Sequence, residues 1–178
     1  MLPPFVGVPT NSALMSPYAT TLVRVAQKFC QSDARKEIFR GLLGLRQELA
    51  NIGIVDGYQW LSGSFLENIE WLEKRDPRDV DIVTVCYRPA SVKGDWSAWA
   101  NLFNTNIRLF DPAQTKTAFR CDARYIDLDM DGLTIVDQTR FWFGLFSHRR
   151  GGLWKGMLRV PLQVTQDDAD ASLIVGSP

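Results

Sequence analysis

Residues 61–85 constrain the fold of this chain more than any other stretch. The stretch opens with Gly63 and Ser64 at the end of a short apolar run, and it closes with Asp79 and Asp81 among β-branched residues. Side chains alternate between the two faces of a strand, so we expect both carboxylates on one face. Neighbouring carboxylates raise each other's pKa unless a cation lies between them. The pattern therefore predicts a divalent-metal site on a strand, with Mg²⁺ the ion that such oxygen ligands favour.

The Gly63-Ser64 pair precedes Phe65, Leu66 and Glu67, a sequence typical of a strand-to-helix turn. Free backbone N–H groups and a hydroxyl at such a turn can hold a phosphate group. We therefore expect Gly63 and Ser64 to bind a phosphate group.

A Gly-Ser pair after a strand, a polar stretch and then Asp-x-Asp on the next strand resemble the nucleotidyltransferase superfamily, which has the polymerase-β-like fold. Four longer segments of the sequence are similar to those of a family of short bacterial nucleotidyltransferase-like proteins. They are YQWLSGSFLE, RDPRDVDIVTV, FWFGLFSHRR and WKGML. The resemblance implies an α+β fold, with a small mixed β-sheet and helices packed on one of its faces. It also implies transfer of a nucleoside monophosphate from a nucleoside triphosphate to a protein or RNA hydroxyl, with Mg²⁺ or Mn²⁺ as the cofactor.

A two-metal site needs a further carboxylate from a neighbouring strand. The candidates are Asp122, Asp127 and Asp129. Strand alternation puts Asp127 and Asp129 on the opposite face from Asp122, so only one of these sets can complete the site. We favour Asp122, which follows an apolar segment, at the position where the superfamily places its third acid. The resemblance implies that Asp122 accepts the proton of the attacking hydroxyl. The expected catalytic and metal-binding residues are thus Asp79, Asp81 and Asp122.

A basic segment at His148, Arg149 and Arg150 precedes Lys155. The guanidinium of Arg149 matches phosphate oxygens in geometry, and the ammonium of Lys155 can bind them as a point charge, so both are candidate phosphate ligands. A solvated basic loop is the alternative interpretation.

Two other functions compete with catalysis. The chain could be an inactive nucleotidyltransferase-like binding module, an antitoxin or regulatory subunit in a toxin–antitoxin or phage-defence system. It could also bind RNA through the basic loop, in which case salt would weaken binding steeply.

The composition is that of an ordinary soluble domain. The chain has 178 residues, 46% of them hydrophobic and 22% charged, with zero net charge, so nothing draws the whole molecule to nucleic acid or membrane. No apolar run is long enough to span a bilayer. Cys30, Cys86 and Cys121 lie in apolar segments without metal-ligand spacing, which favours buried free thiols. We expect a cytoplasmic protein.

The chain divides into an extended arm (1–15), one domain (16–165) and a partly mobile tail (166–178). Ser16-Pro17 predicts a helix start, and Ser32 or Asp33 predicts another. Asp111-Pro112 predicts a helix end. Further expected helices cover 67–71, 95–110 and 134–146; for the last of these a strand is the alternative, and we favour the helix. Expected strands cover 58–61, 79–87, 119–128 and 154–164, the last of them an edge strand because Pro161 cannot donate a ladder hydrogen bond.

Overall fold

The computed structural model of the chain describes residues 1–176. Its elements are η1 (Ser12–Leu14), β1 (Tyr18–Ala19), α1 (Leu22–Phe29), α2 (Asp33–Asn51), β2 (Gly57–Ser62), η2 (Ser64–Leu66), α3 (Ile69–Glu73), β3 (Val80–Cys86), α4 (Trp96–Thr105), α5 (Ile107–Phe110), α6 (Pro112–Phe119), β4 (Cys121–Asp127), α7 (Gly132–Phe146), β5 (Leu158–Pro161) and α8 (Gln166–Val175). The expected α+β class with a mixed sheet is confirmed.

One five-stranded sheet has the order β1-β5-β2-β3-β4. Strand β2 runs antiparallel to both β3 and β5, whereas β3 and β4 are parallel, as are β1 and β5. The expected edge position of β5 is therefore wrong. Strand β1 pairs only with Leu158 and Arg159, so Pro161 lies past the end of that pairing, where its missing N–H disturbs nothing in β1.

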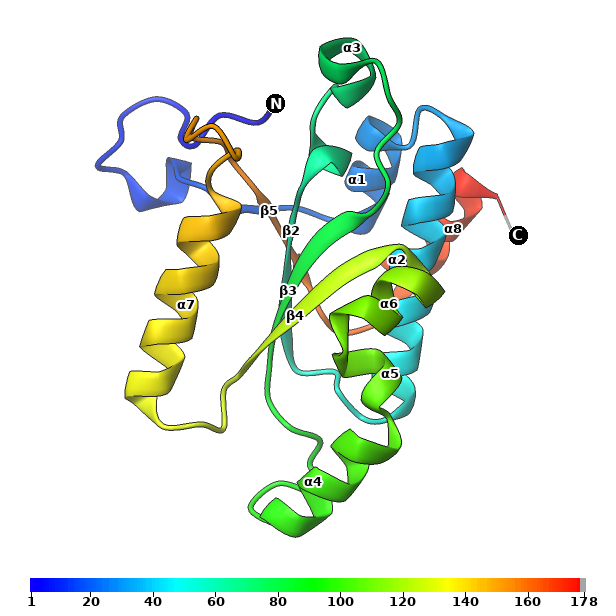
Figure 1. Cartoon of the computed structure of the whole chain (residues 1–178), viewed down its shortest axis with the longest axis vertical. Helices are drawn as coiled ribbons and strands as arrows, with labels where there is room; N and C mark the ends of the chain where they lie inside the picture. Colours follow the sequence, from blue (N-terminus) through cyan, green and yellow to red (C-terminus); the bar gives the residue numbers. More distant parts are fainter. Residues whose placement is uncertain (177–178) are drawn as a thin grey trace.

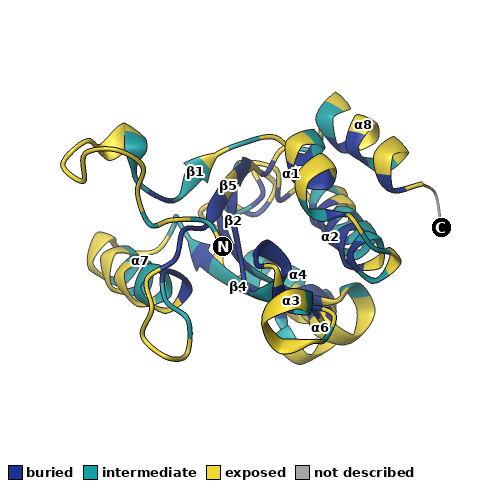
Figure 2. Cartoon of the chain, turned by 90° about the horizontal axis from the view of Figure 1, so that it is seen from above, coloured by how far each residue is buried: buried dark blue, intermediate teal, exposed yellow. Residues whose placement is uncertain are grey.

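Helices cover both faces of the sheet, and the prediction of helices on one face is wrong (Figure 1). The larger core joins the strands to α1, α2, α5 and α8. A smaller cluster on the other face joins Trp60, Val83, Val85 and Ile126 to the inner side of α7. Figure 2 shows the buried residues along the strands and on the inner sides of these helices.

Helix α2 follows the sequence pattern closely. Ser32 accepts a hydrogen bond from the Arg35 N–H and caps the helix, as expected. The apolar stripe of the helix is fully buried: Ile38, Leu42, Leu45 and Leu49. Gly41 is needed for close packing, because a Cβ there would overlap the carbonyl oxygen of Phe119.

Two Xaa-Pro pairs were misassigned. Ser16-Pro17 leads into β1, and the first α-helix starts only at Leu22, capped by Thr21. Asp111-Pro112 does not end a helix but starts α6, with the Asp111 carboxylate accepting hydrogen bonds from the N–H groups of the first turn. The predicted strand 119–128 is consequently shortened to β4.

Residues 166–175 of the predicted tail form α8, and residues 177–178 lie outside the described part of the chain. Thr165 and Asp168 make a reciprocal capping box at its start. The Asp167 carboxylate accepts hydrogen bonds from the Leu22 and Val23 N–H groups at 2.6 and 3.2 Å, which caps α1 in turn. The acidic residues of the segment are thus part of the helical layer.

Candidate functional site

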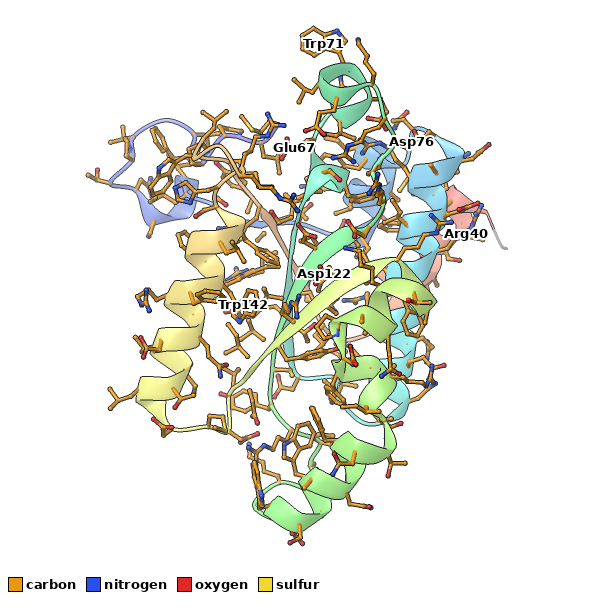
Figure 3. The ribbon with its side chains drawn as sticks, viewed as in Figure 1. Arg40, Glu67, Trp71, Asp76, Asp122 and Trp142 are labelled. Atoms are coloured by element: carbon orange, nitrogen blue, oxygen red, sulfur yellow. The ribbon has the colours of Figure 1, made fainter. Side chains whose placement is uncertain are left out.

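Three carboxylates lie at the beginning of the two parallel strands. Asp79 directly precedes β3, Asp81 is the second residue of β3, and Asp122 is its register partner in β4. Alternation along β3 puts Asp81 on the same face as Val83, which belongs to the cluster under α7. Figure 3 labels Asp122 on this part of the sheet. The predicted grouping of these residues is therefore present in the structure.

The alternative acids lie elsewhere. Asp127 is the last residue of β4 and forms an ion pair with Arg88 at 2.7 Å. Asp129 follows the strand and lies 3.2 Å from the Lys93 ammonium. Of the three candidates for the third acid, Asp122 is the one beside Asp81.

Asp81 is the most perturbed acid of the site. Burial raises its pKa from 3.8 to about 6, and the negative charges of Asp79 and Asp122 add to the rise. Lys155 and Lys116 act in the opposite direction and lower it. The direction of the shift means that the carboxyl group is harder to ionise than an exposed aspartate.

Lys116 was missed by the sequence reasoning. Its ammonium on α6 lies 2.5 Å from Asp79 Oδ2 and 3.6 Å from Asp122 Oδ2, so it bridges two of the three acids. The hydrogen bond to Asp79 raises the pKa of Lys116. Arg124 adds a second cation, 3.0 Å from Asp122 Oδ1. A positive charge thus lies between the acids, as electrostatics requires, and a side chain supplies it.

The Gly-Ser turn lies directly against Asp81. Gly63 has φ of +84°, and a Cβ at this position would lie 2.7 Å from Asp81 Oδ2, so glycine is required for both reasons. Leu66 and Glu67 donate backbone hydrogen bonds to the carbonyls of Gly63 and Ser64. Within residues 1–176 the Ser64 hydroxyl makes no hydrogen bond, so it is free to contact a ligand.

The turn is held from behind by Arg35 of α2. This buried guanidinium donates to the carbonyls of Phe65 and Glu67 at 2.6 Å each. It also pairs with Glu70 at 2.5 Å, and the hydrogen bond lowers the pKa of that carboxyl. The expected helix 67–71 corresponds to the short α3, which begins two residues later, and a separate η2 precedes it.

The predicted phosphate ligands Arg149 and Lys155 both face Glu67. Lys155 Nζ lies 3.2 Å from Glu67 Oε1, and Arg149 Nε lies 3.0 Å from Glu67 Oε2. Arg149 also reaches Glu73 at 3.3 Å. Glu67 and Lys155 are buried, so this ion pair ties the basic loop to the Gly-Ser turn. Lys155 remains close enough to lower the pKa of Asp81.

No group of three or more His, Cys, Asp or Glu side chains within residues 1–176 is arranged to hold a metal ion. The three cysteines are free and buried, as expected, and burial raises the pKa of the Cys30 and Cys86 thiols to about 12. None of the helices in this range is both long and apolar enough to cross a membrane.

Fold and site together define a small α+β protein with an acidic centre at the start of two parallel strands. The chain belongs to the DUF6932 family, described as a family of unknown function, whose model matches residues 1–161. The match ends with β5, so α8 lies outside it. Comparison with curated proteins and with solved structures finds no match.

Proposed function

We propose that this protein is a Mg²⁺-dependent nucleotidyltransferase, which moves a nucleoside monophosphate from a nucleoside triphosphate to a protein or RNA hydroxyl in the cytoplasm. The observation that carries the proposal is the meeting of Asp79, Asp81 and Asp122 on one face, with Gly63 in contact with Asp81. The order of these groups along the chain matches the superfamily pattern. The adjacent unbonded Ser64 hydroxyl supports the assignment of the turn to phosphate.

The ligand chemistry of the three acids fits the implied metal, although their side chains are not arranged around an ion in this structure. Three carboxylates offer only hard oxygen ligands, the kind that Mg²⁺ prefers. Asp79, Asp81 and Asp122 would hold the ion in place of the Lys116 ammonium, which now bridges two of them. When bound, Mg²⁺ would neutralise phosphate charge and help the leaving oxygen depart.

The chain's own groups have separate roles in this proposal. The Ser64 hydroxyl donates a hydrogen bond to a phosphate oxygen. The Asp122 carboxylate accepts the proton of the attacking hydroxyl, which makes that oxygen a better nucleophile. Lys155 stays paired with Glu67 and limits the negative charge near Asp81, so it positions the site rather than touching the substrate.

The test measures transfer of label from α-phosphate-labelled nucleoside triphosphates to total RNA and protein, together with pyrophosphate release. Asp79→Asn and Asp81→Asn are expected to lower transfer by at least a hundredfold while the circular dichroism spectrum is kept. Asp137→Asn is the matched control, because its side chain is 80% exposed on α7. Equal labelling by the wild type and both variants would contradict the proposal.

An inactive binding module is the second candidate, and a specific observation favours it. Lys116 already supplies a cation between Asp79 and Asp122, so two of the three acids are charge-compensated without a metal. Calorimetry with a nucleoside triphosphate separates the two functions. Metal-dependent binding followed by pyrophosphate release supports the proposal of an enzyme. Binding that does not depend on Mg²⁺ and releases no pyrophosphate supports the proposal of an inactive binding module.

A further inference from the structure

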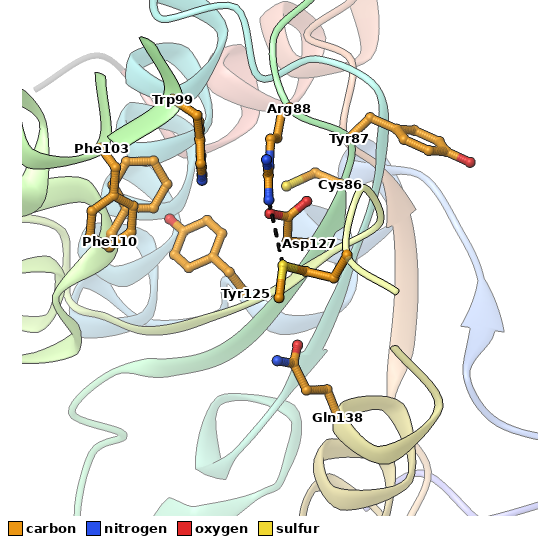
Figure 4. A pocket seen from close by; sticks show the side chains of 10 residues that line it. Cys86, Tyr87, Arg88, Trp99, Phe103, Phe110, Tyr125, Asp127 and Gln138 are labelled. Carbon is orange, nitrogen blue, oxygen red and sulfur yellow. Dashed lines mark hydrogen bonds and ion pairs between the residues drawn. The ribbon is translucent and has the colours of Figure 1, made fainter. Parts of the chain in front are cut away.

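A cavity of about 190 Å³ lies at the other end of β3 and β4. It is lined by residues from the ends of these strands, from α4 and α5, and from α7 (Figure 4). The lining residues are Cys86, Tyr87, Arg88, Trp99, Phe103, Phe110, Tyr125, Asp127, Met130 and Gln138. The carboxyl ends of parallel strands are a frequent position for ligand sites.

This cavity is separate from the acidic centre. Cys86 lies five positions after Asp81 on β3, which corresponds to about 17 Å of strand. Tyr125 and Asp127 also alternate with Asp122 along β4, so they point to the opposite face. A small molecule in the cavity therefore does not contact the three acids, and the inference does not depend on the proposed function.

Aromatic rings form one side of the cavity. Phe110 is at the centre of the group. The centroid of its ring lies 4.5 Å from the ring centroid of Phe103, 5.8 Å from that of Trp99 and 5.1 Å from that of Tyr125. Helix α4, which carries Trp99 and Phe103, contains no buried residue. These apolar rings thus surround a space that they do not fill. The volume suits a single ring system rather than a larger ligand.

Polar groups form the other side. The Arg88 guanidinium is paired with Asp127 at 2.7 Å and lies 5.4 Å from the centre of the Trp99 ring. The positive charge of Arg88 and the negative charge of Asp127 cancel each other, which favours an uncharged ligand. Figure 4 shows the Gln138 amide directed towards the same space. Within residues 1–176 this amide makes no hydrogen bond, so its N–H₂ and C=O are free for a ligand.

We propose that this cavity binds a neutral planar heteroaromatic ring of the adenine type. A glutamine amide matches the adjacent donor and acceptor on the N6/N7 edge of adenine with two hydrogen bonds. The ring faces stack on the aromatic side, where burial of apolar surface and ring–ring contact both favour binding. The ring could be free adenine or the base of a nucleoside, and the two differ in whether a ribose is tolerated.

The experiment uses the full chain and titrates adenine, adenosine and indole by calorimetry, with saturation-transfer NMR to identify the bound protons. Adenine is expected to bind saturably, and indole more weakly because it lacks the N6/N7 edge. Gln138→Leu is expected to weaken adenine by about tenfold and leave indole unchanged, since the lost pair of hydrogen bonds is specific to that edge. Gln27→Leu on the exposed side of α1 is the matched control.

Trp99→Leu is the second variant and is expected to weaken both ligands, with an unchanged thermal midpoint showing that the fold is kept. Binding of adenosine with the same affinity as adenine would assign the site to nucleosides. Binding of adenine without binding of adenosine would assign the site to the free base. Either result supports the proposal. Three outcomes would overturn it: no saturable binding of adenine or indole, equal adenine affinity in Gln138→Leu and the wild type, or loss of adenine binding in Asp81→Asn.

Discussion

Replacing Asp81 by asparagine is expected to stabilise the metal-free protein at neutral pH. Burial and the charges of Asp79 and Asp122 raise the pKa of Asp81 from 3.8 to about 6. A rise of that size corresponds to about 3 kcal/mol against the ionised form. Asparagine keeps the shape of the side chain and removes the charge, so Asp81→Asn gains at most this amount.

The sign of the pH dependence follows from the same shift. Below pH 3.8 the Asp81 carboxyl is protonated in both the folded and the unfolded chain, so it does not affect stability. Between that value and about 6 the unfolded chain has lost the proton while the folded chain keeps it. The contribution of Asp81 to the free energy of unfolding therefore falls as pH rises through this window, and it is lowest above the folded pKa.

Urea unfolding followed by circular dichroism between pH 4 and neutrality tests this reasoning. The stability difference between Asp81→Asn and the wild type is expected to grow from near zero to about 3 kcal/mol, or roughly 6–12 °C in thermal midpoint at neutral pH. Asp137→Asn, whose carboxylate is exposed, is expected to show no such trend. A difference that is absent at neutral pH, or equal at both ends of the range, would refute the electrostatic account.

Two further substitutions test the packing that supports the site. Gly41→Ala is expected to destabilise the protein by about 1–3 kcal/mol or more in urea unfolding, because the added Cβ would overlap the Phe119 backbone. Gly132→Ala is the control and is expected to leave the stability unchanged, because the space around Gly132 is open. Asp168→Ala removes the carboxylate that pairs at 2.6 Å with the buried Arg46, and is expected to cost about 3–5 kcal/mol, whereas exposed Asp170→Ala is expected to cost little. Equal stability within either pair would contradict the corresponding account.

Local patterns in the sequence were enough to predict the strand that carries Asp81 and the strand beside it. Val80–Cys86 and Gly57–Ser62 agree with the expected strands within two residues. The β-branched run in Val80–Cys86, next to a turn signal, has few other solutions. The grouping of Asp81 with Asp122 followed from alternation and from the expectation that the third acid lies on a neighbouring strand.

The Xaa-Pro pairs could not be assigned from local chemistry. The residue before a proline is extended whether it continues as a strand or begins a helix, since an N-cap residue is extended too. Asp111 has φ of −83° and ψ of 117°, which fits both descriptions. What decides between them is the packing of the following residues: Tyr18 enters the sheet, whereas the helix after Pro112 packs on β4 and α2.

The missed helix and the missed cation of the acidic centre have one cause. Residue 116 was expected just before the strand 119–128. It lies instead on α6, where its ammonium contacts Asp79, 37 positions earlier in the chain. Spacing along the sequence cannot reveal a counter-ion delivered by another element. The consequence is chemical: within residues 1–176 no cation lies at ion-pair distance from Asp81, which agrees with its raised pKa. A divalent ion entering this centre would have to displace Lys116, and it would relieve the unpaired charge of Asp81 in doing so.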